Sequence, residues 1–144
     1  MIEIHSHAPQ GFSSALQVSA CYLLFEGKIL LLKRAADKIE PHVWGVPAGK
    51  LEQGETPLEA AIRELHEETS IRITHAQLHY LDTFYIKKPS SEFVYHRFKV
   101  DLTHFPDVQL SAEHTAFTWA SKEELSTLPL IVGARELIVH FFEQ

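Results

Sequence analysis

Three glutamates recur at helical spacing in the middle of the chain, within the run GKLEQGETPLEAAIRELHEETSI that spans residues 49–71. Glu64, Glu67 and Glu68 fall on one side of a helix, because residues three and four apart share a helical face. Like charges held so closely repel one another and destabilise the helix unless something neutralises them. A hard divalent cation with oxygen ligands is the natural candidate. This feature therefore predicts a helix with a cation site along its edge.

The start of this helix is predicted by local chemistry. Thr56 suits the N-cap, and Pro57 suits the first helical position, where its missing N–H carries no penalty. The apolar residues that follow recur with the period of a buried helical face; they are Leu58, Ala61, Ile62 and Leu65. At about 100° per residue the glutamates lie beside this apolar stripe, between core and solvent. Taken alone, the fragment RELHEE is more typical of a solvated acidic surface.

The longer run changes this interpretation. Gly49, Glu55, Arg63-Glu64-Leu65, Glu67-Glu68 and Ile71 stand at the spacing of the Nudix box, and eight of its nine constrained positions match. From average residue usage, a chance match in 144 residues is of the order of one in a million. The preceding run WGVPAGK is similar to the family's approach to the box. The chain therefore resembles the MutT-like Nudix hydrolases, which cleave a nucleoside diphosphate linked to some group X.

Two residues depart from the family pattern. Ser70 stands where the box has a glycine that ends the helix in a left-handed conformation, which serine adopts less readily. This change concerns the end of the helix and removes no metal ligand. Ala48 replaces a common glycine before Gly49, and the sequence gives no reason to expect a particular effect.

The resemblance implies a set of site residues. Four of them would bind Mg²⁺, or Mn²⁺ in its place: the carboxylates of Glu64, Glu67 and Glu68 and the carbonyl of Gly49. Glu55 and Arg63 are expected to brace the loop and the helix behind these ligands, and Arg63 is counted with the catalytic residues for this reason. A bound cation would neutralise and orient the phosphates of a substrate and acidify a water molecule.

A general base is also required, and two carboxylates are candidates. One is Glu64 itself. The other is Glu113, a loop residue a few positions before a strand with Trp119, which many family members use as an extra metal ligand or base. Glu113 is equally typical of a solvated loop carboxylate. The neighbouring His114 is a weaker alternative, because a neutral imidazole also accepts protons.

Basic and aromatic residues are candidates for binding the substrate. Arg34 and Lys50 are expected to contact phosphates, although lone cations are usually solvated. Phe84 and Tyr85 are expected to stack on a nucleobase, although aromatic residues on strands more often belong to the core.

The fold expected is a single α/β domain over residues 1–144, with a flexible N-terminal segment over residues 1–14. Its composition, 45% hydrophobic and 22% charged, is ordinary for a globular protein. Strands are expected over 16–25, 28–34, 44–46, 71–86, 92–102 and 116–120, the fourth with a break near Thr74. Helices are expected after Thr56, after Ser121 and over 133–142. The resemblance implies an α/β/α sandwich whose mixed sheet contains many antiparallel pairs.

Charge and composition exclude several classes of function. A formal net charge of −6 without a long basic run argues against binding of a long nucleic acid. No apolar run approaches the roughly 18 residues of a membrane-spanning helix, and the N-terminus lacks the pattern of a secretory signal. A single cysteine, Cys21, fits a reducing cytoplasm. The question of a homodimer stays open.

The function expected is Mg²⁺-dependent hydrolysis of a diphosphate bond in a small phosphorylated nucleotide, most of all a nucleoside triphosphate. Nucleotide sugars, ADP-ribose and dinucleotides are alternative substrates of the same reaction. A non-catalytic module that senses a nucleotide is the alternative of another class. The complete run of Arg63 and the three glutamates argues against it, because binding alone would not need such a repulsive cluster.

Overall fold

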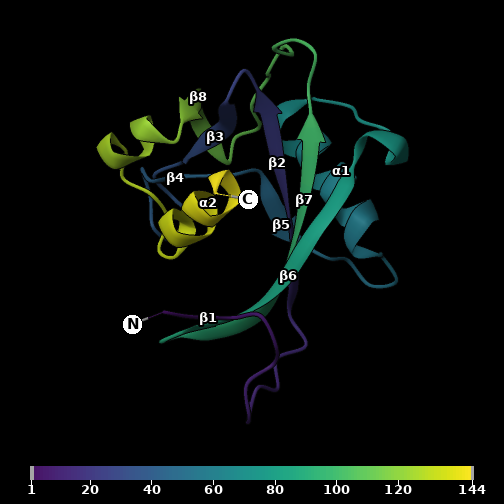
Figure 1. The fold of residues 1–144 in the computed structure, drawn as a ribbon, viewed down its shortest axis with the longest axis vertical. Helices are drawn as coiled ribbons and strands as arrows, with labels where there is room; N and C mark the ends of the chain where they lie inside the picture. The colour runs from purple at the N-terminus through teal and green to yellow at the C-terminus, as the bar shows by residue number, and fades with distance from the viewer. Residues whose placement is uncertain (1, 144) are drawn as a thin grey trace.

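The computed structural model describes residues 2–143, in which a mixed sheet is covered by α1 on one face and α2 on the other (Figure 1). The strands are β1 (Glu3–His5), β2 (Gln17–Phe25), β3 (Lys28–Arg34), β4 (Trp44–Gly45), β5 (Ala48–Lys50), β6 (His79–Lys88), β7 (Ser91–Asp101) and β8 (His114–Ser121). The helices are α1 (Pro57–Thr69) and α2 (Ala134–Phe142), with 3₁₀ helices η1 (His75–Gln77) and η2 (Glu123–Thr127). The predicted α/β/α sandwich is confirmed. No described helix is long and apolar enough to cross a membrane.

The sheet opens between its two central strands. Its order is β1-β6-β7-β2-β3-β4, and β8 pairs with β3. Of these strand pairs, β2 with β7 is the parallel one, and the others are antiparallel. Strands β2 and β3 pair only near their hairpin, at Leu24 and Phe25 of β2. The other end of β2 pairs instead with the short β5, through Val18 to Ala20. Strand β5, which leads toward α1, therefore lies at the point where the sheet divides.

The central strands are buried on both faces, which explains their continuous apolar sequence. On β3, Leu30 and Leu32 belong to the core that contains Leu65 of α1. Ile29 and Leu31 belong to the core on the other face, which contains Ile138 of α2. Alternate residues of one strand thus fill two cores, one beneath each helix.

The structure corrects the prediction of a flexible N-terminus at residues 3–5. These residues form β1, in which Ile4 pairs with Ile86 of β6 and packs against the core beneath α2. The pairing covers part of the outer edge of β6. Sequence reasoning missed it because three residues are too few to give a strand pattern.

The structure also corrects the strand predicted over residues 71–86. Ile71 and Ile73 are buried beneath α1, but their segment is irregular and leads into η1, before β6 begins at His79. Their alternating pattern reflects burial against the helix and not a place in the sheet. The connection between the strands predicted over 71–86 and 92–102 is shorter than expected, since β6 extends to Lys88 and β7 begins at Ser91.

Candidate active site

Helix α1 begins as predicted, with a capping box at its first turn. The Thr56 hydroxyl accepts a hydrogen bond from the Glu59 amide, and the Glu59 carboxylate accepts one from the Thr56 amide. Pro57 occupies the first turn. This capping box satisfies amide groups that the first turn would otherwise leave without partners.

The other end of α1 shows how serine replaces the family's glycine. Ser70 adopts the left-handed conformation, with φ 65°, and its amide donates to the His66 carbonyl. The adjoining Gln109 amide donates to the Thr69 carbonyl, at 2.9 Å, which ties the helix end to the loop before β8. The helix therefore ends where a glycine would end it, at a conformational cost of roughly 1 kcal/mol.

Arg63 is the centre of a network that joins α1 to the preceding loop. Its guanidinium donates to both carboxylate oxygens of Glu55, at 2.7 and 2.9 Å, and to the Lys50 carbonyl at 3.0 Å. It also donates to Glu64 at 2.8 Å and to Glu67 at 3.1 Å. These contacts agree with the bracing role expected for Glu55 and Arg63. The one guanidinium orients three carboxylates at once.

Gly49 of β5 meets Glu64 so closely that a side chain at position 49 would displace the Glu64 carboxylate. A Cβ atom on Gly49 would lie 2.0 Å from the Glu64 carboxyl carbon, which the side chain of α1 could not accommodate without moving. Burial raises the pKa of Glu64, while Arg63 lowers it and the charges of Glu67 and Glu113 raise it. The packing thus brings a main-chain segment of β5 against a partly desolvated carboxylate.

Glu68 is the most deeply buried of the acidic side chains. The residue is only 5% exposed, and its carboxylate accepts a hydrogen bond from the Ala48 amide at 3.2 Å. Burial is the main reason that its pKa rises to about 9, followed by the charge of Glu64; the charge of Glu113 adds to the rise and that of Arg34 opposes it. In the absence of a cation this carboxyl group is therefore protonated at neutral pH.

The loop before β8 brings further charges to the same place. Glu113 is half-exposed and forms an ion pair with Lys38 at 3.6 Å, and its backbone carbonyl accepts from the Ala35 amide. Its charge raises the pKa of both Glu64 and Glu68, so Glu113 lies near enough to these carboxyl groups to act on them. Its role as a ligand or base stays a prediction.

His114 lies beside this loop in an unusual state. Its Nδ1 is the buried side-chain polar atom without a hydrogen-bond partner among residues 2–143. Burial lowers the pKa of His114, the charge of Glu113 raises it, and the charges of Arg34 and Lys38 lower it further. A neutral His114 is thus favoured at neutral pH.

The donor set of the site fits a hard cation, although the side chains are arranged around Arg63. All candidate ligands are oxygen atoms: three helical carboxylates, the Glu113 carboxylate and the Gly49 carbonyl. Among the described residues, no three acidic, histidine or cysteine side chains converge closely enough to hold an ion as they stand. Arg63 draws Glu64 and Glu67 toward itself. Burial and the charge of Glu64 favour the protonated form of Glu68. A cation would replace part of the role of the guanidinium and lower the pKa of Glu68.

The residues predicted to bind substrate divide between the two faces of the sheet. Arg34 acts on Glu68 by its charge, on the face of α1, and its Nε donates to the Ile39 carbonyl. Lys50 pairs with Val18, and Phe84 pairs with Tyr95. Val18, Phe84 and Tyr95 belong to the core on the opposite face of the sheet, beneath α2. Tyr85 follows Phe84 on an extended strand and therefore points to the other side, where it meets Phe12 edge-on. The structure thus separates Phe84 from Tyr85.

Sequence reasoning missed a second polar cluster, beneath α2. Arg97 of β7 is fully buried and forms two hydrogen bonds of 2.7 Å with the carboxylate of Asp82 on β6. It also donates to the Leu137 carbonyl and to His140 Nδ1 on α2. The one signal in the sequence was that Arg97 stands two residues after Tyr95, at a core-facing position of the strand.

Comparisons with known proteins agree with the geometry. The model of the family described as NUDIX domain matches residues 15–141. The CTP pyrophosphohydrolase of Escherichia coli (strain K12) is 32% identical over 118 residues, which cover 80% of this chain and 82% of that protein. A Myxococcus xanthus protein named octanoyltransferase is 36% identical over 116 residues, 78% of this chain, but the chain spans only 32% of its length. The crystal structure of the MutT protein from Methanosarcina mazei Go1 has the same fold, with a TM-score of 0.76 at 23% identity over 89% of this chain and 92% of that one.

Proposed function

This chain belongs to the Nudix family of hydrolases, and from that membership we propose that it cleaves the diphosphate bond of a nucleoside triphosphate. The observation that carries the proposal is the buried carboxyl group of Glu68. Burial is the main reason that its pKa rises to about 9, and the charges of Glu64 and Glu113 add to the rise. A buried carboxyl group beside other carboxylates suits a divalent cation shared with phosphates.

Glu64, Glu67, Glu68, Glu113 and the Gly49 carbonyl would hold this cation, Mg²⁺ or Mn²⁺. When bound, it supplies charge neutralisation for the phosphates and acidifies a water molecule. Arg63 keeps Glu64 and Glu67 oriented while the Glu55 carboxylate keeps Arg63 in place. Arg34 and Lys38 add positive charge on the side of the loop before β8, where an anionic substrate gains from it.

Glu64 and Glu113 remain the two candidates for the general base. Glu64 is partly buried and held by Arg63, whereas Glu113 is half-exposed and held by Lys38. The base must lose its proton before the reaction, so its loss changes the acidic limb of the pH–rate profile. We expect only one of Glu64→Gln and Glu113→Gln to abolish that limb, while the other lowers the rate at all pH values.

Nucleoside triphosphates are the substrates that we place first. A relative that this chain matches over 82% of its own length is named for its action on CTP. Nucleotide sugars, ADP-ribose and dinucleotides are therefore the second set of substrates to assay.

The test is a substrate panel with purified protein and Mg²⁺, in which the released product is identified as pyrophosphate or phosphate. We expect a nucleoside triphosphate to yield the monophosphate and pyrophosphate. Glu67→Gln serves as the inactive control, since it keeps the size of the side chain and removes a candidate ligand. Equal turnover by the wild type and this variant, or tight nucleotide binding with no turnover of any diphosphate at saturating metal, would refute the proposal.

A further inference from the structure

Two edges of the sheet differ in how well they are protected. One is formed by β6, where β1 pairs with residues 85–87 and covers part of the edge. The other is formed by β8, which lies beside β3 and away from β6 (Figure 1). Within residues 2–143, β3 is the one strand with which β8 pairs. The outer side of β8 is therefore open to a further strand, because an unpaired edge presents a row of backbone N–H and C=O groups.

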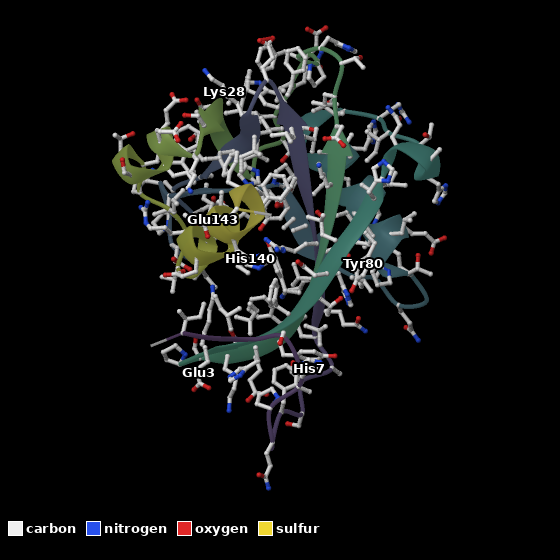
Figure 2. The ribbon with its side chains drawn as sticks, in the orientation of Figure 1. Glu3, His7, Lys28, Tyr80, His140 and Glu143 are labelled. Carbon is white, nitrogen blue, oxygen red and sulfur yellow. The ribbon has the colours of Figure 1, made fainter. Side chains whose placement is uncertain are left out.

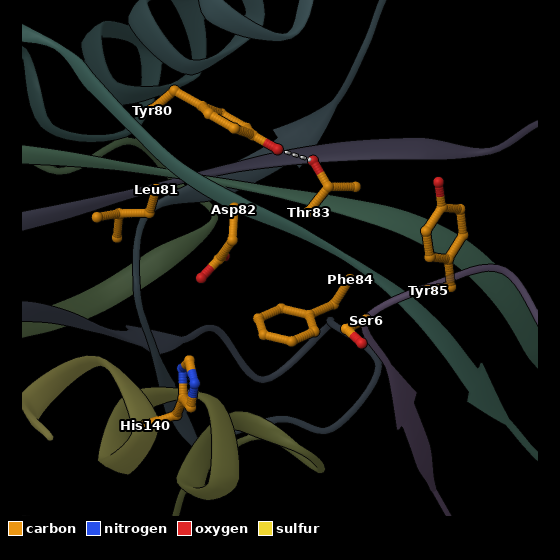
Figure 3. Close-up of a pocket in the computed structure, with 8 residues that line it drawn as sticks. All are labelled: Ser6, Tyr80, Leu81, Asp82, Thr83, Phe84, Tyr85 and His140. Atoms are coloured by element: carbon orange, nitrogen blue, oxygen red, sulfur yellow. Dashed lines mark hydrogen bonds between the residues drawn. The ribbon is translucent and has the colours of Figure 1, made fainter. Parts of the chain in front are cut away.

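The β6 edge has features that oppose the addition of a strand. Glu3 of β1 pairs in register with Lys87 of β6, so charged side chains accompany this edge, and Figure 2 shows Glu3 there. Leu81 is an extra residue in the ladder between β6 and β7, which bends the strand. Figure 3 shows the hydroxyl groups of Tyr80 and Thr83 meeting beside this irregularity, at 2.7 Å. Charges and a bulge are the usual means of protecting an edge.

Strand β8 lacks these features. Residues 114–121 read HTAFTWAS and contain no Asp, Glu, Lys, Arg or Pro. The register with β3 is regular from Ala116 to Ser121, since its one shift lies before Ala116. On the face of α2 the strand carries small residues, Ala116, Thr118 and Ala120. A second strand can therefore approach this edge without meeting a charge or a bend.

The other face of β8 has an exposed aromatic surface. Phe117 and Trp119 pair with leucines of β3 that lie in the core beneath α1. Phe117 is 43% exposed, although it lies on a strand. The ring of Trp119 lies 5.0 Å from that of Phe105, which is also exposed. Contiguous apolar side chains at a surface commonly mark a site of protein contact.

A second copy of the same strand fits this edge. Two identical edges pair in the antiparallel sense about a two-fold axis, which places the same surface of each copy against the other. With the axis at Phe117, its side chain lies opposite Phe117 of the second copy, with about 5 Å between their Cβ atoms. Ala116 then lies opposite Thr118 of the second copy. The two exposed rings thus cover each other at the centre of the interface.

The charges that flank β8 favour the antiparallel sense. Glu113 precedes the strand and Lys122 follows it, so antiparallel pairing brings opposite charges together and parallel pairing brings like charges together. Glu113 already forms an exposed ion pair with Lys38, at 3.6 Å. Lys122 pairs with Glu143 at 3.3 Å, and its ammonium group has further N–H donors for a second carboxylate.

We propose that this protein forms a symmetric dimer in which the outer edges of two β8 strands pair antiparallel about Phe117, so that the two sheets become one. Backbone hydrogen bonds and the contact between the aromatic surfaces stabilise it. The interface is small, so we expect a reversible dimer that is half dissociated at about 10 µM. The inference does not depend on the proposed reaction, because the pairing uses none of the helical glutamates.

The first test follows the mass of the full-length protein by sedimentation, at concentrations from about 1 to about 100 µM. We expect the mass to rise from that of one chain to that of two. Hydrogen exchange then locates the interface, and outward amides among residues 115–119 should exchange at least about tenfold more slowly at the higher concentration. A single chain at all concentrations would overturn the proposal and leave this edge to a strand of another protein. Concentration-dependent protection confined to β1 or β6 would overturn it as well.

The second test places a charge at the axis. Phe117→Lys sets two like charges opposite each other and should raise the dissociation constant of the dimer at least about tenfold. Tyr80→Lys is the matched control, because Tyr80 is an exposed aromatic residue on the other edge strand. We expect this control to keep the dissociation constant of the wild type. Equal weakening in both variants, or none in folded Phe117→Lys, contradicts the assignment.

Cross-linking tests the register and does not require the charged variant to fold. Cys21 is the one native cysteine and is buried, so Phe117→Cys adds a thiol that is accessible. Side chains that face each other across an antiparallel pair come close enough for a disulfide. Under mild oxidation we expect Phe117→Cys to form a covalent dimer at least about tenfold faster than Tyr80→Cys. Equal rates would reject pairing about Phe117.

Discussion

Two arginines organise the polar interior of this protein, and their surroundings differ in charge. Arg63 binds Glu55 through two hydrogen bonds and then faces Glu64 and Glu67 as well. Arg97 also binds one carboxylate through two hydrogen bonds, but its further partners are the Leu137 carbonyl and the neutral Nδ1 of His140. The first cluster has more negative charge than one guanidinium can neutralise, and the second is balanced.

This difference teaches what each cluster can do. The carboxylates at the edge of α1 can bind a metal ion in place of the Arg63 guanidinium. Glu67, whose side chain is half-exposed, can turn toward such an ion. The Arg97 pair is enclosed between the rings of Tyr22 and Phe84, at 5.2 and 5.0 Å, and is held on three elements. We therefore expect substitutions near Arg63 to affect activity and substitutions at Arg97 to affect stability.

The largest effect is expected for Glu64→Gln. Loss of this carboxylate removes a candidate metal ligand and should lower turnover about 10³-fold, which corresponds to ~4 kcal/mol of activation free energy. Steady-state kinetics at saturating Mg²⁺ measures it. Glu136→Gln on α2 should retain wild-type turnover, and a similar loss in both variants would contradict the division between the two regions.

Arg97→Met should destabilise the fold by about 3 kcal/mol, because it leaves the Asp82 carboxylate partly buried without its partner. Arg63→Met should lower the free energy of unfolding by less, about 1–2 kcal/mol, because the Arg63 side chain is 22% exposed whereas that of Arg97 is fully buried. Urea denaturation compares the two variants. Equal losses would show that the Arg63 network stabilises the fold as much as the buried pair of Arg97 and Asp82 does.

The metal-free protein should become less stable as the pH rises. The folded pKa of Glu68, about 9, lies above the unfolded value of 4.5, so the folded state keeps a proton that the unfolded state loses. Stability is therefore highest near pH 4.5 as far as this group is concerned and falls by a few kcal/mol toward pH 9.

Thermal unfolding between pH 5 and 9 in the presence of a chelator measures this slope. Glu68→Gln should flatten it, because the amide does not ionise. Saturating Mg²⁺ should also reduce it, because a cation favours the charged carboxylate. A slope that is the same in the wild type and in Glu68→Gln assigns the pH dependence to other groups.

The smallest effect is expected at the end of α1. Ser70→Gly should stabilise the protein by about 1 kcal/mol, since glycine adopts φ 65° without the strain of a side chain. Ser70→Ala is the matched control, because it removes the hydroxyl and keeps the strain. Chemical denaturation should place the glycine variant above the wild type and the alanine variant at or below it. Loss of stability in the glycine variant would mean that the Ser70 hydroxyl bond to Gln109 outweighs the strain.

Much of the acidic site could be predicted because most of its residues lie in one short segment, whose helical spacing fixes their relative positions. Thr56, Pro57 and the apolar stripe define a helix, and a helix fixes how Glu64 and Glu68 lie relative to each other. The resemblance assigned Gly49 and Glu64 to one site, and the packing of β5 against α1 brings them into contact. Residues 71–78 were predicted wrongly as strand, because burial beneath α1 gives an alternating pattern without strand pairing.

The cluster of Arg97, Asp82 and His140 could not be predicted, since its members come from three elements that meet only in the folded chain. A one-residue bulge decides that Asp82 faces α2, and no local pattern announces that extra residue. Phe84 and Tyr85, which sequence proximity had suggested as a pair, lie on opposite sides because consecutive residues of a strand alternate.

By itself the sequence determined the family, the reaction class and the helix that carries the carboxylates, because these depend on residues close together in the chain. The tertiary structure decided which carboxyl group is buried, which loop brings Glu113 near Glu64 and Glu68, and which face of the sheet each candidate substrate residue occupies. The physical reason is that desolvation and cross-strand register arise from distant segments packed together, and neither is encoded in a local spacing.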